Sequence, residues 1–158
     1  MDIGDNKIIA DPQVFSGGIS LDDRGHLRYF NDLPLNTVRM YVVDNHDTGF
    51  VRAFHGHLKE SKLVFVPQGM AHFICFPILS SECYDEMYKG IREFTLSSKV
   101  PQMLLIPAGW YHGYKTFSQD TQVIFFSDRT LNQSIDDDVR LRADFFVPSR
   151  NVWEPKPR

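Results

Sequence analysis

The chain has 158 residues, of which 42% are hydrophobic and 23% are charged, and its formal net charge is -3. This length and composition fit one folded domain with a sizeable core, so we expect residues 1–158 to form a single domain. The near-neutral charge leaves no basic excess to displace counterions, and we therefore expect no nucleic-acid partner.

The amino terminus, MDIGDNK, is polar and acidic, and no stretch approaches the roughly 18 consecutive apolar residues of a membrane span. We therefore expect a soluble, cytoplasmic protein with no membrane partner. The cysteines Cys75 and Cys83 form no CxxC motif, and they fit a reducing compartment better than a disulfide framework.

Short β-branched and aromatic runs follow one another along the chain, separated by Gly, Pro, Asp, Asn and Ser, and they predict an all-β fold. In chain order these runs occupy 26–30, 37–44, 50–57, 62–69, 71–78, 92–96, 103–109, 114–117 and 121–128. Residues 80–91 and 131–141 favour short helices. Strands at this density predict a sandwich or a closed barrel, of which the jelly roll is one member.

The predicted strand at 37–44 alternates in character. Val38, Met40 and Val42 fall on one face, and Arg39 and Tyr41 fall on the other. This alternation suggests that the polar face lines a cavity as well as meeting solvent.

Two histidines stand two positions apart in the next predicted strand. The side chains of His55 and His57 leave the same face, with their backbones about 7 Å apart. Such a pair fits a metal site or a catalytic cluster, and on its own it fits a solvated edge strand equally well.

A second motif further along the chain favours a functional site. Pro107, Gly109 and His112 form the pattern Pro-x-Gly-x2-His, and Gly49 precedes His55 by six positions. Together the two segments match both halves of the cupin signature, Gly-x5-His-x-His and Pro-x-Gly-x2-His. This match implies a cupin jelly roll, the double-stranded β-helix barrel.

Four longer segments narrow the resemblance to cupin-type sugar-nucleotide enzymes. They are LDDRG at 21–25, VRAFHGH at 51–57, KLVFVPQG at 62–69 and IPAGWYHGY at 106–114. The chain resembles the dTDP-4-dehydrorhamnose 3,5-epimerases and the dTDP-4-keto-6-deoxyglucose 3,4-ketoisomerases from about residue 14 to residue 153. The resemblance implies an epimerase or ketoisomerase that forms an enolate from a nucleotide-linked 4-keto-6-deoxy sugar, acts as a homodimer without cofactor or metal, and serves surface polysaccharide synthesis.

The resemblance also implies catalytic roles. His55 stands at the position of the base, Lys62 at that of the enolate-stabilising lysine, and Asp144 at that of the acid paired with His55. His57 is similar to the second histidine of the ketoisomerases, where it would pass protons between neighbouring positions. Chemically, an imidazole can accept a proton near neutral pH, and a lysine can hold an oxyanion.

The substrate-binding residues implied are Arg24, Arg52 and His112, and Arg39 is likewise suited to bidentate contacts with a diphosphate. Regular alternation places Arg52 on the face opposite His55, so we expect a bulge if both reach one ligand. Phe125 or Phe126 stands where the epimerases carry an acid tyrosine, which favours single epimerisation or ketoisomerisation over double inversion.

Two other functions remain open from the sequence. One is a metal-dependent cupin with His55, His57, Glu60 and His112 as ligands. The other is a non-catalytic protein that only binds a sugar nucleotide. The acidic run 136–138 has neither the spacing nor the glycine of a cation-binding loop, and we expect it to form a solvated face or to begin a helix.

Overall fold

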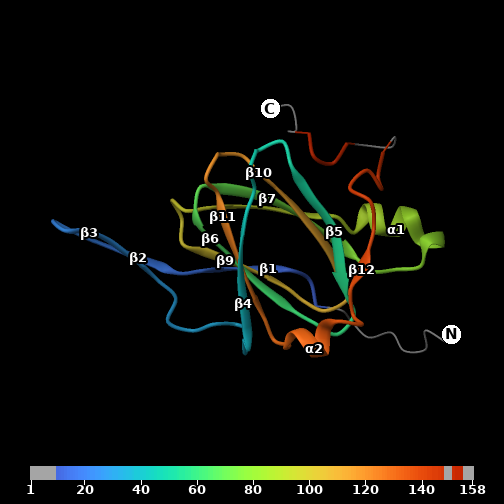
Figure 1. The fold of residues 1–158 in the computed structure, drawn as a ribbon, viewed down its shortest axis with the longest axis horizontal. Coiled ribbons are helices and arrows are strands. Elements are labelled where there is room, and N and C mark those ends of the chain that lie inside the picture. Colours follow the sequence, from blue (N-terminus) through green and yellow to red (C-terminus); the bar gives the residue numbers. More distant parts are fainter. Residues whose placement is uncertain (1–9, 148–150, 155–158) are drawn as a thin grey trace.

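Two antiparallel sheets of five strands face each other in this computed structural model, which describes residues 10–147 and 151–154 (Figure 1). The first sheet has the order β1 (Gln13–Ser16), β9 (Gln102–Ile106), β6 (Lys62–Gln68), β11 (Gln122–Ser127) and β4 (Arg39–Asp44). The second sheet has the order β12 (Val139–Arg140), β5 (Val51–His57), β10 (Trp110–Thr116), β7 (Met70–Pro77) and β8 (Arg92–Ser97). The all-β jelly-roll prediction is confirmed.

The helices are shorter than the sequence predicts. A 3-10 turn at Ser81–Cys83 leads into α1 (Tyr84–Lys89), inside the predicted range 80–91. The second helix, α2 (Leu131–Ser134), begins with a capping box between Thr130 and Gln133 and covers only the start of the predicted range 131–141. The prediction is wrong beyond this point because the chain turns into β12, which pairs with β5.

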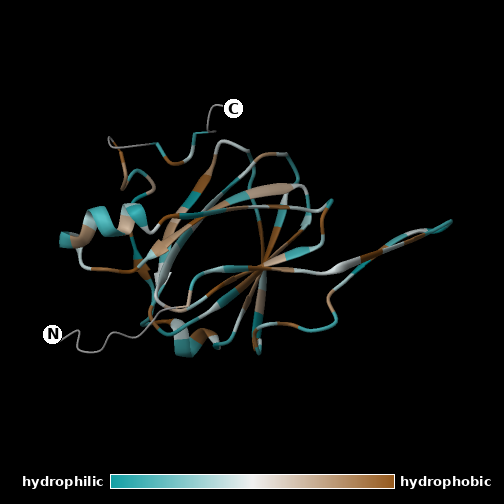
Figure 2. Ribbon diagram, turned by 180° about the vertical axis from the view of Figure 1, so that it is seen from behind, coloured by the Kyte–Doolittle hydropathy of each residue, from teal (hydrophilic) through white to brown (hydrophobic). Residues whose placement is uncertain are grey.

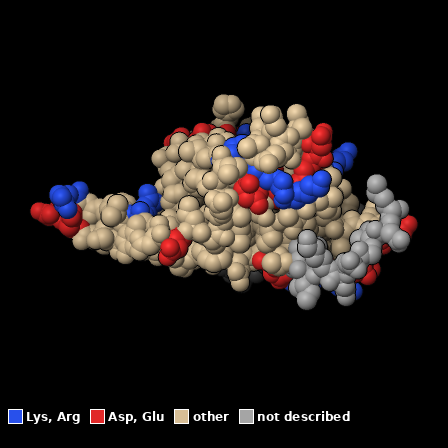
Figure 3. Space-filling model, turned by 90° about the horizontal axis from the view of Figure 1, so that it is seen from below, with Lys and Arg blue, Asp and Glu red and all other residues tan. Residues whose placement is uncertain are grey.

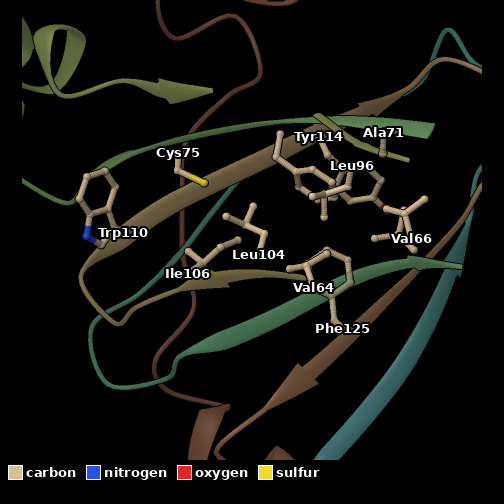
Figure 4. Close-up of a cluster of buried hydrophobic side chains, with 12 residues drawn as sticks. Val64, Val66, Ala71, Cys75, Leu96, Leu104, Ile106, Trp110, Tyr114 and Phe125 are labelled. Carbon is tan, nitrogen blue, oxygen red and sulfur yellow. The ribbon is translucent and has the colours of Figure 1, made fainter. Parts of the chain in front are cut away.

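Apolar side chains from both sheets meet between them and form the main core. Val64, Leu104 and Phe125 come from the first sheet, and Cys75 and Tyr114 from the second (Figure 4). Figure 2 shows hydrophobic residues on the strands that surround this interior. Because each strand alternates inward and outward residues, the same strands can also carry polar side chains into the barrel.

A second apolar cluster covers the outer face of the second sheet. Phe54 and Phe76 point outward from this sheet and pack against Met87 of α1 and against Phe146 and Val152 near the carboxyl end. This packing fixes the position of β5, whose inward residues include the histidine pair.

A bulge in β5 confirms the irregularity predicted from Arg52. In the pairing of β10 with β5, His112 lies opposite His55 and Tyr114 lies opposite Arg52, so three positions on β5 match two on β10. The bulge reverses the alternation and lets Arg52 share the inner face with the histidine pair.

A hairpin of β2 (Gly18–Asp22) and β3 (Gly25–Tyr29) projects from the body of the molecule (Figure 1). Arg28 anchors its base by donating to the backbone carbonyls of Pro67 and Ser98 at 3.1 and 2.6 Å. Leu21 and Leu27 near its tip are 74% and 64% exposed. The projecting hairpin therefore presents apolar surface that the described part of the chain leaves exposed.

Both cysteines are unbonded thiols, as predicted. Among residues 10–147 and 151–154, no helix is both long and apolar enough to cross a membrane.

Candidate active site

Three imidazoles gather on the inner face of the second sheet. His55 and His57 come from β5, and His112 comes from the neighbouring β10. The ring of His112 lies 6.3 Å from that of His55 and 6.2 Å from that of His57, measured between centroids. The structure thus brings together the histidines of both halves of the cupin signature.

Two adjoining hollows open beside these histidines. The inner hollow, of about 160 Å³, is lined by the three histidines together with Tyr41, Arg52, Tyr114 and Phe125. The outer hollow, of about 310 Å³, is lined by Arg39, Tyr41, His55, His57, Glu60, Lys62, Asp138 and Arg140 among others. Tyr41, His55 and His57 line both hollows, so the two form one continuous candidate site. The prediction that the polar face of β4 lines a cavity is confirmed.

The opposite wall of the site holds a buried cluster of charges around Glu60. The Glu60 carboxylate, whose side chain is 0% exposed, accepts hydrogen bonds from Lys62 Nζ at 2.5 Å and Arg39 Nη2 at 2.6 Å, and from the Ser127 hydroxyl. Burial alone would raise the pKa of Glu60, but these donors lower it to about 2. Burial lowers the pKa of Lys62, and the hydrogen bond with Glu60 opposes this shift.

This cluster bears on the metal-dependent alternative. Glu60, one of its four candidate ligands, is already bound to two cations. Within the described part of the chain, no group of three or more His, Cys, Asp or Glu side chains is placed to hold a metal ion.

The tautomer of neutral His57 follows from its hydrogen bond. His57 Nδ1 lies 2.7 Å from the backbone carbonyl of Asp137, which can only accept, so Nδ1 carries the hydrogen. Glu60 Oε2 lies 3.3 Å from the same nitrogen. In the neutral ring the other nitrogen, Nε2, is therefore free to accept a proton.

Asp137 also corrects the interpretation of the acidic run as solvated. Its carboxylate is buried and accepts three backbone N–H groups, those of Leu58, Lys59 and Glu60, at 2.9, 2.9 and 3.0 Å. Asp137 thus fixes the turn between β5 and β6, which links the histidine pair to Glu60 and Lys62.

The carboxylate that the structure places beside His55 is Asp138, whereas Asp144, which the sequence suggested for this place, lies elsewhere. Asp138 Oδ1 lies 3.8 Å from His55 Nδ1, within the range of an ion pair. Asp144 is half exposed instead, and Arg142 engages both of its carboxylate oxygens at 2.7 and 2.8 Å. The pairing of β12 with β5 sets Val139 opposite Gly56 and Arg140 opposite His55, so it holds the preceding Asp138 beside the site, whereas Asp144 lies beyond the end of this strand.

His55 and His112 lie in surroundings that disfavour their charged forms. Burial lowers the pKa of His55 and the positive charge of Arg140 lowers it further, while Asp138 opposes the shift. Burial and the neighbouring His57 hold the pKa of His112 well below its usual range. Neutral imidazoles on this wall can accept a proton at neutral pH.

Three of the four predicted substrate-binding residues line the candidate site, and the fourth does not. His112 and Arg52 line the inner hollow, and Arg52 Nε donates to Asn45 Oδ1 at 2.6 Å. Arg39 lines the outer hollow, and one of its guanidinium nitrogens donates a hydrogen bond to Glu60. Arg24 is not brought to the histidines of its own chain, because it lies in the turn of the projecting hairpin, 85% exposed and paired with Asp22 (Figure 1).

Sequence reasoning missed the position of Asp138 in the site, assigned no role to Tyr41, and weighed Glu60 only as a metal ligand. The alternation in 37–44 already pointed Tyr41 toward a cavity. The position of Glu60, two residues before Lys62, was the available signal for their ion pair.

The family model described as dTDP-4-dehydrorhamnose 3,5-epimerase matches residues 9–146. The chain belongs to this family. A curated relative, the spore coat polysaccharide biosynthesis protein SpsL of Bacillus subtilis (strain 168), is 30% identical over 137 residues, which cover 85% of this chain and 83% of the relative. The members of the dTDP-4-dehydrorhamnose 3,5-epimerase family are isomerases, and the enzyme class predicted from the sequence is thereby confirmed.

Solved structures share the fold. The dTDP-4-dehydrorhamnose 3,5-epimerase of Bacillus anthracis str. Ames, with TDP and PPi bound, is 24% identical, with a TM-score of 0.70 and coverage of 83% of this chain and 78% of that one. The WlaRB TDP-quinovose 3,4-ketoisomerase of Campylobacter jejuni is 18% identical, with a TM-score of 0.66 and coverage of 87% and 98%. Both branches named by the sequence resemblance therefore have this fold.

The buried cluster predicts a large loss of stability on removal of its central carboxylate. We expect Glu60→Ala to lower the free energy of unfolding by about 3–5 kcal/mol, because it leaves two cations without their buried counter-charge. Urea denaturation at pH 7 measures the change. Glu82→Ala, an exposed glutamate on the 3-10 turn, serves as the control and is expected to change it by less than about 0.5 kcal/mol. An equally small effect of Glu60→Ala would show that the ion pairs do not hold the walls together.

Proposed function

We propose that the protein epimerises, or 3,4-ketoisomerises, a dTDP-linked 4-keto-6-deoxyhexose through an enolate, as a cytoplasmic enzyme of surface polysaccharide synthesis. The observation that carries the proposal is the pairing of neutral imidazoles on one wall of the site with a buried cation on the other. Membership of the family supports the reaction class. The name of the Bacillus subtilis relative supports the polysaccharide context.

The chemistry needs these two walls. A hydrogen next to a ketone becomes acidic only when the enolate oxygen left behind is stabilised. His55 takes the proton from the second-sheet side, and Lys62 holds the oxygen from the first-sheet side. The Lys62 ammonium has three N–H donors, and its bond to Glu60 leaves two of them for a ligand.

The remaining residues suit the other parts of such a substrate. Arg52 at the inner hollow is exposed, and because its bond to Asn45 uses Nε, its terminal nitrogens can bind a diphosphate, for which a guanidinium is well shaped. His57, with its acceptor nitrogen free, can move a proton between adjacent carbon and oxygen atoms in a ketoisomerisation. Asp138 replaces Asp144 as the carboxylate that stabilises protonated His55.

The test of the proposed function follows deuterium into dTDP-4-keto-6-deoxyglucose by NMR in heavy water. We expect the wild-type protein to exchange the hydrogen next to the ketone. His55→Asn should abolish this exchange while leaving TDP affinity nearly unchanged, since the base acts only at the reacting carbon. His46→Asn, at an exposed histidine, should retain exchange. Absence of exchange by the wild type on nucleotide 4-keto sugars would favour the non-catalytic alternative.

The pH dependence of kcat/KM should follow the charges around His55. Because the pKa of His55 is lowered below 6.5, its neutral form persists to lower pH, and we expect the acid limb below pH 6.5. Asp138→Asn removes a charge that favours imidazolium and should move this limb to lower pH. Arg140→Gln removes one that opposes imidazolium and should move it to higher pH. Shifts in the same direction would argue against His55 as the base.

We propose further that the working unit is a homodimer in which the projecting hairpin packs on a second copy. Its exposed leucines need a covering partner, and the edge strand β4, which follows the hairpin along the chain, also exposes Met40 and Val42 at 55% and 46%. Figure 3 shows charged atoms gathered at the tip of the hairpin and uncharged surface along much of its length. In a dimer, Arg24 would reach the nucleotide bound by the partner.

The dimer is tested by introducing charged residues into the apolar surface of the hairpin. We expect the double variant Leu21→Asp and Leu27→Asp to sediment as a monomer, because each carboxylate would otherwise be buried in the interface. Val147→Asp, at an apolar residue that is 50% exposed outside the hairpin, should leave the assembly unchanged. Arg24→Ala should keep the dimer but weaken TDP binding. A monomeric wild type in analytical ultracentrifugation would refute this assembly.

A further inference from the structure

Tyr41 holds a central position in the site that the roles above leave unused. Its ring lines both hollows. It stacks flat on Phe125, with centroids 5.3 Å apart and an interplanar angle of 11°, because the two residues lie directly opposite each other in the pairing of β4 with β11. Tyr41 is 36% exposed and lines the hollows, so a ligand in the site can touch it.

The two walls carry different groups. Tyr41 belongs to the first sheet, whereas His55 and His57 belong to the second, and the hollows lie between them. A proton removed by His55 and returned by either histidine goes back to the same face of the enolate, because both leave the same strand on the same side. Inversion at that carbon requires a donor on the opposite wall.

Phe125 cannot be that donor, because it has no acidic hydrogen. It is 3% exposed and faces the three histidines from the first sheet, with its ring centroid 6.0 Å from that of His112. Tyr41 is its direct neighbour on the same wall and brings a hydroxyl to that side of the site.

We propose that Tyr41 is a catalytic residue, the acid that returns a proton to the enolate carbon on the face opposite His55. The assignment rests on the proposed function and narrows it to an inversion at the carbon next to the ketone. His55 takes the proton as the C–H bond breaks, and the electron pair moves onto the oxygen held by Lys62. The Tyr41 O–H bond then breaks, a C–H bond forms on the opposite face, and the carbonyl re-forms. The imidazolium and phenolate are reset by proton exchange with solvent.

The surroundings of Tyr41 suit a phenol that must be protonated before it reacts. Burial, followed by the negative charge of Glu60, raises the pKa of Tyr41 to about 12, so the hydroxyl carries its proton at neutral pH. Lys62 Nζ and Arg39 Cζ lie 5.4 and 5.6 Å from the ring centroid. These cations stabilise the phenolate once the proton has left.

Tyr114 is the other phenol at the inner hollow and provides the matched control. It is 3% exposed, and its hydroxyl is enclosed with no hydrogen-bond partner among the described residues. It lies on β10 of the second sheet, on the histidine side, and its ring is 5.8 Å from that of Phe125. Because Tyr114 lies on the same sheet as His55, it cannot donate a proton to the opposite face of the enolate.

The experiment compares Tyr41→Phe and Tyr114→Phe with the wild type on dTDP-4-keto-6-deoxyglucose in heavy water. We expect the wild type to form a product inverted and deuterated next to the ketone. Tyr41→Phe should lower its formation about 100-fold, on the scale of losing one general acid. It should still exchange deuterium into the substrate with retained configuration, because His55 remains. Tyr114→Phe, which removes the other phenol of the inner hollow, should lower the rate of inverted product far less than Tyr41→Phe does.

Thermal unfolding and TDP affinity show whether each variant is folded, and both are expected to match the wild type for Tyr41→Phe. Inverted product from Tyr41→Phe at the wild-type rate, or a loss confined to Tyr114→Phe, would overturn the assignment. A wild type that exchanges deuterium but yields only retained substrate or a 3-keto product would also overturn it, with the proposed function intact. A wild type that exchanges no deuterium would overturn both the assignment of Tyr41 and the proposed function.

Discussion

The carboxylate of Glu60 is the contact on which the geometry of the site depends. It receives Arg39 from β4, Lys62 from β6 and the Ser127 hydroxyl from β11, so it joins three strands of the first sheet at one point. Its second oxygen lies beside His57 at the end of β5, in the second sheet. A single buried acid thereby sets the distance between the wall that carries the cations and the wall that carries the imidazoles.

Asp137 stabilises the positions of Glu60 and His57. By accepting three consecutive backbone N–H groups, it shapes the turn that carries the chain from His57 to Glu60. Its own backbone carbonyl fixes the tautomer of His57. One residue of the segment before β12 thus orients both the turn and a histidine, and the next residue, Asp138, faces His55. The short strand β12 matters because its pairing with β5 places this acidic segment over the site.

The barrel and the histidine cluster were predictable from the sequence because they depend on local periodicity and on motifs of fixed spacing. The alternation through Arg39 and Tyr41 indicated the wall of a cavity, and the register of Arg52 required the bulge that the structure contains. The choice between Asp138 and Asp144 was not predictable. It depends on the pairing of the short strand β12 with β5, which is a tertiary outcome that no spacing encodes.

Burial of an acidic run likewise cannot be predicted from its composition. Three consecutive aspartates resemble a solvated surface, and the middle one, Asp137, becomes a buried acceptor only because the turn at residues 58–60 presents its N–H groups to it. The roles of Glu60 and Tyr41 depend in the same way on cross-strand neighbours distant in sequence, such as Ser127 and Phe125.

The balance of charge across the site has a consequence for catalysis. Arg39 and Lys62 bring two positive charges to one carboxylate, so the first-sheet wall keeps an excess positive charge in a place with little solvent. The facing wall adds imidazoles whose surroundings favour the neutral form at His55 and His112. An unbalanced buried charge is costly in the empty protein, because burial removes its hydration. In the mechanism proposed above, this cost is relieved when negative charge develops on a bound oxygen, first on the enolate and then on a phenolate at Tyr41. The cluster that holds the two walls together is thus arranged to favour the charged intermediates over the neutral ground state.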